Sequence, residues 1–177
     1  MTTPPPLITT PAELAATAER LRAAGWFALD TEFIRETTYW PRLCLIQVAT
    51  ADTLALIDPL TLDDLTPLLE VLFDPGVTKV LHAAAQDLEI FHHMTGEVPG
   101  PIFDTQVAAP LLGWPEQAGF ARLVEGVLGE RLGKGHARTD WSERPLPEEA
   151  LAYAADDVRY LVPLYQYLHH NLADRGR

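Results

Sequence analysis

The stretch Trp26–Phe33 constrains the fold most, because four apolar residues run directly into two acids, Asp30 and Glu32, that are one position apart. An apolar run of this length is typical of a buried strand. Residues i and i+2 of a strand point to the same side, so the two carboxylates are predicted to lie side by side at its end. Carboxylates held that close repel each other, and burial adds to the cost. The pattern indicates a divalent cation such as Mg²⁺, which prefers oxygen ligands; the alternative is a strand that ends in solvent with both acids hydrated.

The composition favours one globular domain. The chain has 177 residues, 47% of them hydrophobic and 21% charged, which is enough for a sizeable core. The formal net charge of −12 argues against a protein that holds nucleic acid on a broad basic face. It remains compatible with a protein that reaches nucleic acid through bound metal ions and a local basic loop.

The one cysteine, Cys44, lies in an apolar run, so we expect a small core residue rather than a disulfide or a thiolate metal site. A lone cysteine fits a reducing compartment. The sequence shows neither a signal-peptide pattern nor a window that resembles a membrane span. We therefore expect a cytoplasmic protein with no membrane partner.

The order of the predicted elements indicates an α/β fold with a mixed central β-sheet flanked by helices. Residues 1–8 are predicted to be an irregular lead-in, and residues 131–144 an irregular polar segment. Pro163 is predicted to kink the last helix. Strands are predicted over 26–33, 42–50, 53–57 and 77–81, and helices over 10–24, 61–73, 84–94, 104–112, 121–128 and 147–172.

Two further segments carry residues suited to chemistry. Asp87 falls in the first turns of a predicted helix, where the alternative is an acid favoured by the helix dipole. Tyr153 and Asp157 are four residues apart and share a helix face, where the alternative is a solvated acid beside a half-buried tyrosine. We interpret Asp104 as a plain helix N-cap and His82 as a structural hydrogen-bonding residue.

Taken in order, these segments resemble the motifs of the exonuclease domain of the ribonuclease D group. This group belongs to the DEDD superfamily of 3′-5′ exonucleases, in the subclass with a tyrosine in the third motif. The resemblance covers roughly residues 8 to 170 and implies a ribonuclease H-like (DnaQ-like) fold. It also implies a single exonuclease domain over residues 1–177, without the C-terminal helical nucleic-acid-binding domains of full-length ribonuclease D proteins. The matching segments are 29–33 continuing through 38–47, 80–91, 138–146 and 153–161.

The resemblance implies a site built around two divalent cations, Mg²⁺ or Mn²⁺. Asp30 would bridge the two ions, as in related exonucleases. Glu32 and Asp157 would complete the ligands of the first ion, and Asp87 would serve the second. Tyr153 would position or activate the attacking water, and orientation is the favoured role because a tyrosine of ordinary pKa is a poor base at neutral pH. The neighbouring Asp156 also has a compatible spacing, but the family pattern favours Asp157.

Contacts to the substrate are predicted from two segments. Four cations in residues 131–144 are expected to guide phosphates toward the site, the alternative being an ordinary solvated loop. Aromatic residues after the first strand are expected to stack on terminal bases, although core packing is an equal alternative for Phe33. The residues concerned are Arg131, Lys134, Arg138 and Arg144, and Phe33, Tyr39 and Trp40.

The leading hypothesis is a metal-dependent 3′-5′ exonuclease that acts on RNA or single-stranded DNA with a free 3′ end and releases nucleoside 5′-monophosphates. A non-catalytic nucleic-acid-binding module with the same fold is the first rival, and the complete set of five site residues argues against it. An unrelated α/β phosphatase or nucleotide-binding enzyme is the second. It would need a Gly-rich phosphate loop after the first strand, and none is present. The sequence leaves the choice between RNA and DNA and the oligomeric state open.

Overall fold

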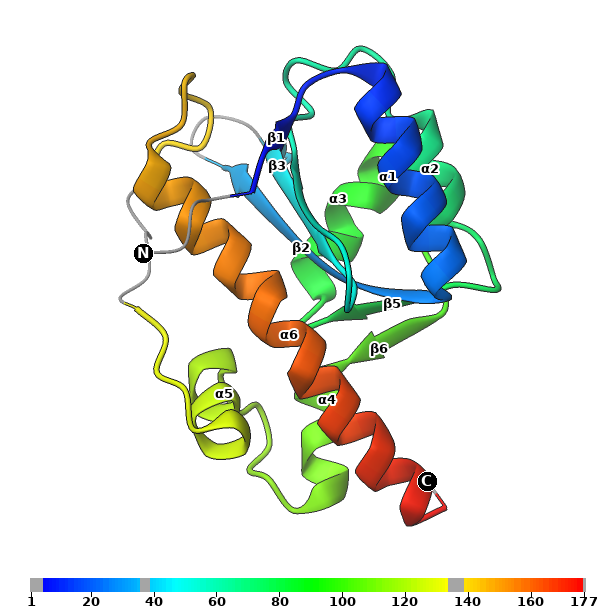
Figure 1. The fold of residues 1–177 in the computed structure, drawn as a ribbon, viewed down its shortest axis with the longest axis vertical. Coiled ribbons are helices and arrows are strands. Elements are labelled where there is room, and N and C mark those ends of the chain that lie inside the picture. The colour runs from blue at the N-terminus through cyan, green and yellow to red at the C-terminus, as the bar shows by residue number, and fades with distance from the viewer. Residues whose placement is uncertain (1–4, 36–38, 134–138, 177) are drawn as a thin grey trace.

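The computed structural model describes residues 5–35, 39–133 and 139–176. A mixed six-stranded sheet carries helices on both faces, as the sequence predicts (Figure 1). The strands are β1 (Leu7–Ile8), β2 (Trp26–Ile34), β3 (Arg42–Ala49), β4 (Leu54–Ile57), β5 (Thr78–Leu81) and β6 (Ile102–Asp104). The helices are α1 (Pro11–Ala24), α2 (Thr66–Leu72), α3 (Ala85–Thr95), α4 (Thr105–Ala108), the 3₁₀ turn η1 (Ala109–Leu112), α5 (Phe120–Leu128) and α6 (Glu148–Asp174). Within the part of the chain that is described, no helix combines the length and the apolar character needed to cross a bilayer.

The strand order is β1-β4-β3-β2-β5-β6. β3 is antiparallel to both β2 and β4, and the other neighbouring pairs are parallel. β2 pairs with β5 only over Trp26–Ala28. The C-terminal half of β2 therefore extends past the end of β5, and α3, which follows β5, comes to lie beside it.

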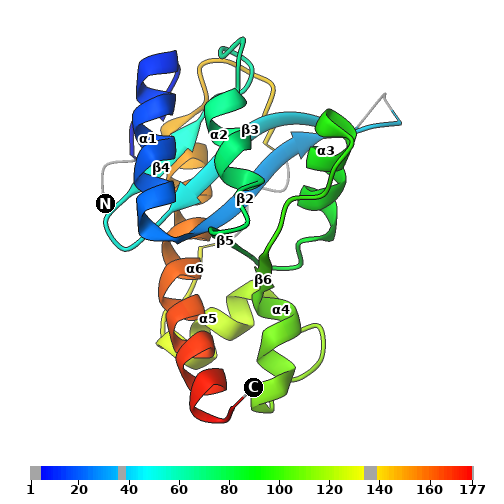
Figure 2. The same ribbon diagram turned by 90° about the vertical axis from the view of Figure 1, so that its right-hand side faces the viewer.

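The two faces of β2 belong to different cores. Phe27 and Leu29 lie in the core shared with α1 and α2, whereas Ala28 lies in the core shared with α6. Because side chains alternate along a strand, Asp30 and Glu32 continue the face of Ala28, toward α6. Figure 2 shows α1 and α2 on one side of the sheet and α6 on the other.

α6 crosses β2, β3 and β4, and its N-terminal half approaches the sheet through small side chains. Ala150, Ala154 and Ala155 are buried against Cys44 and its neighbours in the sheet. Cys44 is confirmed as a buried core residue with a free thiol. The helix continues past Pro163 to Asp174, and its second half packs near α4 and α5 (Figure 1).

Three predictions about secondary structure are wrong. The predicted lead-in contains β1, which gains its order by pairing with β4. The helix predicted over 61–73 begins at Thr66, because the backbone N–H groups of Thr61 and Leu62 donate to the Asp58 carbonyl in a turn. β6, inside a segment predicted to lack a strand, is three residues long, too short to show a strand periodicity.

Candidate active site

Asp30 and Glu32 lie on β2 beside a break in its pairing with β3. The register shifts between Glu32 and Phe33, which marks a bulge or irregularity immediately after the second acid. Such irregularities redirect side chains and are common next to functional sites. Both acidic side chains are partly buried.

Asp87 comes from α3 and is tied to the same strand. It lies in the first turn of the helix, it is 7% exposed, and its Oδ1 accepts a hydrogen bond of 2.5 Å from the Thr31 hydroxyl. Thr31 stands between the first two acids in sequence and points to the opposite face of β2. A third carboxylate is therefore fixed against the strand that carries the first two.

Tyr153 and Asp157 come from α6, one helical turn apart on the same face. Burial raises the pKa of the Tyr153 phenol to about 12, and the nearby charges of Asp157, Glu32 and Asp30 act in the same direction. The phenol therefore lies within electrostatic reach of the strand acids and keeps its proton at neutral pH.

The charges of Asp87 on α3 and Asp157 on α6 raise the pKa values of Asp30 and Glu32 on β2, which indicates that three elements bring these acids close to Asp30. Burial is the largest cause and raises the pKa of Asp30 well above its ordinary value, and the charges of Asp87, Asp157 and Glu32 add to it. Burial, with Asp157 and Asp87, raises the pKa of Glu32 to about 8. Burial also raises the pKa of Asp157 to about 7, with help from Asp156.

Asp87 titrates lower than its partners because it has a hydrogen-bond donor. Burial raises its pKa to about 6, while the hydrogen bond from Thr31 favours the ionised form and acts in the opposite direction. Of the three acids whose pKa values are raised to about 6, 7 and 8, Asp87 is therefore the one that ionises most readily, and the ionised form is the one that binds a cation.

The donor set suits a hard divalent cation, which carboxylate oxygens bind and whose charge would offset their repulsion. Within the described ranges, no three acid, histidine or cysteine side chains already form a coordination shell. The fit rests on the chemistry of the donors and on their concentrated negative charge.

Asp156 is directed differently from Asp157. Its carboxylate forms an ion pair with Arg159 of the same helix, and its side chain is 40% exposed. Asp156 is also not among the groups that raise the pKa values of Asp30 and Glu32. This arrangement agrees with the expectation that Asp157, rather than Asp156, belongs to the site.

The structure describes two of the four predicted cations of the 131–144 segment. Lys134 and Arg138 lie outside the described residues. Arg131 is exposed and pairs with Glu125. The prediction for Arg144 is wrong, because its guanidinium is bound to Asp58 and to three backbone carbonyls and has no donor left for a phosphate.

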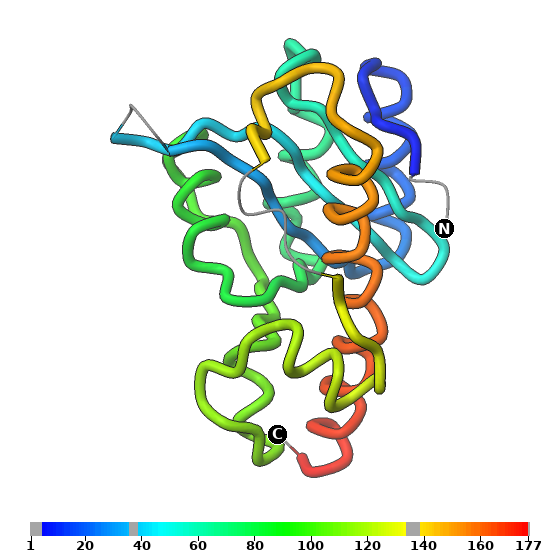
Figure 3. The backbone as a smooth tube through the Cα atoms, turned by 90° about the vertical axis from the view of Figure 1, so that its left-hand side faces the viewer, coloured from blue at the N-terminus to red at the C-terminus, as the bar shows by residue number. Residues whose placement is uncertain are grey.

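Of the three aromatic residues predicted to contact the substrate, one packs against the core and two are exposed. Phe33 is partly buried against the core of α1 and α2, so core packing holds for it. Tyr39 is 80% exposed and meets Trp40 edge-on. Trp40 stacks on His93 of α3, with ring centroids 4.4 Å apart and planes 12° apart. Tyr39 and Trp40, which lie between β2 and β3, thus form an aromatic surface with His93 of α3. Figure 3 shows the outer ends of β2 and β3 beside α3.

Asp104 does more than the predicted capping. It caps α4 by accepting from the Gln106 backbone N–H, and it also accepts from the N–H groups of Ala83 and Ala84. Ala83 has a φ of 57°, an uncommon conformation for a residue with a Cβ. Asp104 therefore holds the β5–α3 junction that leads to Asp87. His82 has the predicted structural role, with its Nδ1 2.9 Å from the Thr105 hydroxyl.

Replacing Thr31 with valine tests the link to Asp87. Thr31→Val keeps the branched shape but leaves Asp87 without its donor, so we expect the pKa of Asp87 to rise and its position to loosen. Loss of a group that supports a ligand typically lowers metal affinity or activity by about 10- to 100-fold. A titration of activity against Mn²⁺ should show a higher midpoint, whereas an unchanged midpoint would remove Thr31 from the site.

Comparison with known proteins identifies the class. A family model described as 3′-5′ exonuclease matches residues 5–173. The chain therefore belongs to the 3′-5′ exonuclease family.

The relatives place it beside ribonuclease D within that family. Ribonuclease D of Zymomonas mobilis is 51% identical over 174 residues, which cover 97% of this chain and 45% of that protein. The crystal structure of Escherichia coli RNase D matches with a TM-score of 0.92 and 46% identity, over 99% of this chain and 46% of that one. The chain thus spans about half the length of these relatives. The predictions of a ribonuclease D-like domain and of a ribonuclease H-like fold are confirmed.

A more distant structure is solved with a metal. Brucella melitensis NrnC with bound Mg²⁺ is 28% identical, with a TM-score of 0.73, over 86% of this chain and 76% of that one.

Proposed function

We propose that the chain is a metal-dependent 3′-5′ exonuclease that removes nucleoside 5′-monophosphates from the free 3′ end of RNA, with single-stranded DNA as a second possible substrate. One observation carries the proposal: β2, α3 and α6 bring four carboxylates and the Tyr153 phenol close to one another. Membership of the exonuclease family supports it. We further propose that the described residues form one exonuclease domain, and that it works in the cytoplasm, where the buried free thiol of Cys44 would stay reduced.

Asp30, Glu32 and Asp157 would hold one divalent cation, and Asp87 together with Asp30 a second. Mg²⁺ or Mn²⁺ bound there would acidify the attacking water and stabilise the charge that develops on the leaving 3′-oxygen. NrnC, a relative solved with Mg²⁺, supports this choice of ions. The hydrogen bond from Thr31 lowers the pKa of Asp87 and so favours the ionised form that would bind the cation.

Tyr153 would orient the attacking water. Its pKa of about 12 makes the phenol a hydrogen-bond donor rather than a base in the neutral range. Its place one turn from Asp157 would let it hold a water next to a metal ligand. Removing a proton from that water would then depend on the ions, which lower the pKa of a bound water.

The substrate would approach over the outer end of β2. The exposed ring of Tyr39 and the stacked pair of Trp40 and His93 offer flat surfaces on which bases can stack. Stacking of this kind tolerates any nucleotide sequence, because every base has a flat aromatic face. We keep Lys134 and Arg138 as proposed phosphate contacts, whereas Phe33 packs against the core and is left to a supporting role.

The direct test uses a 5′-labelled, single-stranded RNA with Mn²⁺ and a matched sample with chelator. We expect a ladder that shortens from the 3′ end in Mn²⁺ and intact RNA with chelator. A parallel DNA strand of the same sequence reports the sugar preference. Internal cleavage products, or cleavage that persists in chelator, would contradict the proposal.

Three conservative variants test the assignment on α6. Tyr153→Phe removes only the hydroxyl, so the fold and metal binding should persist while the single-turnover rate falls by about 10²-fold, as expected for a proton-handling group. Asp157→Asn should be inactive, and Asp156→Asn, the matched control, should cleave normally. An active Asp157→Asn together with an inactive Asp156→Asn would mean that the wrong acid has been assigned.

A further inference from the structure

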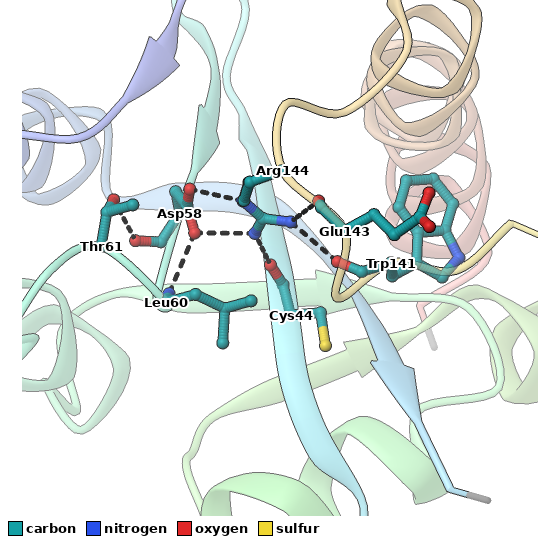
Figure 4. Close-up of polar contacts among 7 residues, drawn as sticks. All are labelled: Cys44, Asp58, Leu60, Thr61, Trp141, Glu143 and Arg144. Atoms are coloured by element: carbon teal, nitrogen blue, oxygen red, sulfur yellow. Dashed lines mark hydrogen bonds and ion pairs between the residues drawn. The ribbon is translucent and has the colours of Figure 1, made fainter.

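The Arg144 side chain uses every donor it has. Its Nε and Nη2 donate to the two carboxylate oxygens of Asp58, each at 2.7 Å. The second Nη2 hydrogen goes to the Cys44 carbonyl on β3, at 2.7 Å. Nη1 donates to the carbonyls of Trp141 and Glu143, at 2.8 and 2.7 Å. A guanidinium has five N–H groups, so the network shown in Figure 4 is complete.

Both carboxylate oxygens of Asp58 are likewise occupied by hydrogen bonds. Asp58 follows β4 directly and its side chain is 1% exposed, so an unpaired charge there would be costly. One of its oxygens also accepts from the Leu60 backbone N–H. Burial favours the neutral acid, but the hydrogen bonds from Arg144, Leu60 and Thr61 and the charge of Arg144 together outweigh it and hold the pKa of Asp58 below its ordinary value.

The segment that Arg144 fastens leads into α6. Trp141 and Leu146, on either side of Arg144, are buried together with the alanines of the first turns of α6. α6 begins four residues after Arg144, at Glu148, and Tyr153 packs against the same cluster. The network therefore joins the start of α6 to β3, which lies next to β2 in the sheet order, and to the end of β4, the strand beyond β3.

α6 needs such a fixed point. It contributes two site residues but is not part of the sheet, so no ladder hydrogen bonds set its position. Packing of Ala154 and Ala155 against the sheet brings the helix close, yet apolar contact is non-directional. One residue of slippage would move α6 by about 1.5 Å and rotate it by about 100°. A misplacement of about 1 Å can cost about 10²-fold in rate.

We propose that Arg144 and Asp58 are positioning residues of the active site: their ion pair sets the place of α6 along the sheet, so that Tyr153 and Asp157 face Asp30 and Glu32. The inference rests on the proposed exonuclease function for its kinetic consequence. Neither residue is expected to touch the substrate or a metal ion. The ion pair should therefore influence the catalytic rate and the metal affinity only through the position of α6.

The test compares Arg144→Lys and Asp58→Asn with the wild type. Lysine keeps the charge but lacks the planar fork and two of the donors, and asparagine keeps the shape of Asp58 without its charge. We expect kcat on single-stranded RNA to fall about 10-fold or more while KM changes little, which is the size of effect seen for groups that orient ligands. Calorimetric titration with Mn²⁺ should show a similar loss of affinity without any substrate present.

Two controls separate positioning from simple loss of stability. Arg22→Lys changes an arginine of α1 that pairs with Glu70 and Asp74 on the other face of the sheet, and it should match the wild type. Val71→Ala truncates a buried side chain of α2, on the other face of the sheet, and should lower the melting temperature without changing kcat or Mn²⁺ affinity.

The outcomes are distinct. An inactive wild type would refute the exonuclease function, while the Mn²⁺ titration would still report on the position of Asp157. Wild-type kcat and Mn²⁺ affinity in both folded variants would overturn the positioning role. It would equally be overturned if Val71→Ala, at a similar melting temperature, lost as much kcat. Failure of both variants to fold would also overturn it, because the pair would then hold the whole fold rather than the place of α6.

Discussion

Asp30→Asn is expected to abolish exonuclease activity and leave the fold intact. Asp30 is the carboxylate that the other three acids influence, so it holds the centre of the proposed metal site. Its loss should remove several kcal/mol of metal-dependent transition-state stabilisation, which corresponds to a rate loss of at least about 10³-fold. Asparagine has the shape of aspartate, so the neighbouring core, with Ala28 and Leu29, should be undisturbed.

The stability of the same variant provides a second, opposite readout. Removing one of several crowded charges relieves repulsion, so with chelator the variant should melt at or above the temperature of the wild type. Asp52→Asn, in the exposed turn between β3 and β4, is the matched control and should change neither activity nor melting. If Asp30→Asn melted well below the wild type in chelator, Asp30 would be a structural residue and the assignment would fail.

The metal-free protein is expected to lose stability as the pH rises from about 5 to 8. The pKa values of Asp87, Asp157 and Glu32 are raised to about 6, 7 and 8 in the folded state, mainly by burial. The folded protein therefore binds more protons than the unfolded chain in this range, and its advantage disappears as these groups ionise. One pKa unit is worth about 1.4 kcal/mol, so the melting temperature should fall by at least roughly 3 °C for a chain of this size.

Divalent ions should reverse this trend. Ions bind the ionised carboxylates of the folded state, and at 100 times the dissociation constant they add roughly 2.7 kcal/mol to the free energy of unfolding. Differential scanning calorimetry at pH 5, 6.5 and 8, with chelator or with Mn²⁺, measures both effects. In Asp30→Asn the pH dependence in chelator should be shallower. A melting temperature in chelator that rises with pH, or that Mn²⁺ leaves unchanged at pH 8, would contradict a cluster of repelling carboxylates.

The sequence predicts the parts of the site that depend on local periodicity. The i, i+2 spacing puts Asp30 and Glu32 on one face of β2, and the i, i+4 spacing puts Tyr153 and Asp157 on one face of α6. The order of strands and helices likewise predicts the mixed sheet. These features depend on backbone geometry that a short window of sequence determines.

The contacts that support the site could not be predicted in this way. The Thr31 hydroxyl and Asp87 are 56 residues apart, and Arg144 and Asp58 are 86 residues apart. The sequence predicts that Arg144 guides phosphates, because nothing in a short polar segment reveals a buried partner such as Asp58. The sequence predicts that Asp104 is a helix cap, but the hydrogen bonds it accepts from Ala83 and Ala84 depend on β5 and β6 lying side by side.

The most direct test of the central claim is to identify the first product released in water enriched in oxygen-18. A short RNA with a unique 3′-terminal base is incubated with the protein and Mn²⁺, and the products are analysed by mass spectrometry. The account predicts that the first product is the 3′-terminal nucleoside 5′-monophosphate, with one oxygen-18 atom on its phosphate. Release of an unphosphorylated nucleoside, of a 3′-phosphate, of oligonucleotide fragments, or of a monophosphate without oxygen-18 would contradict it.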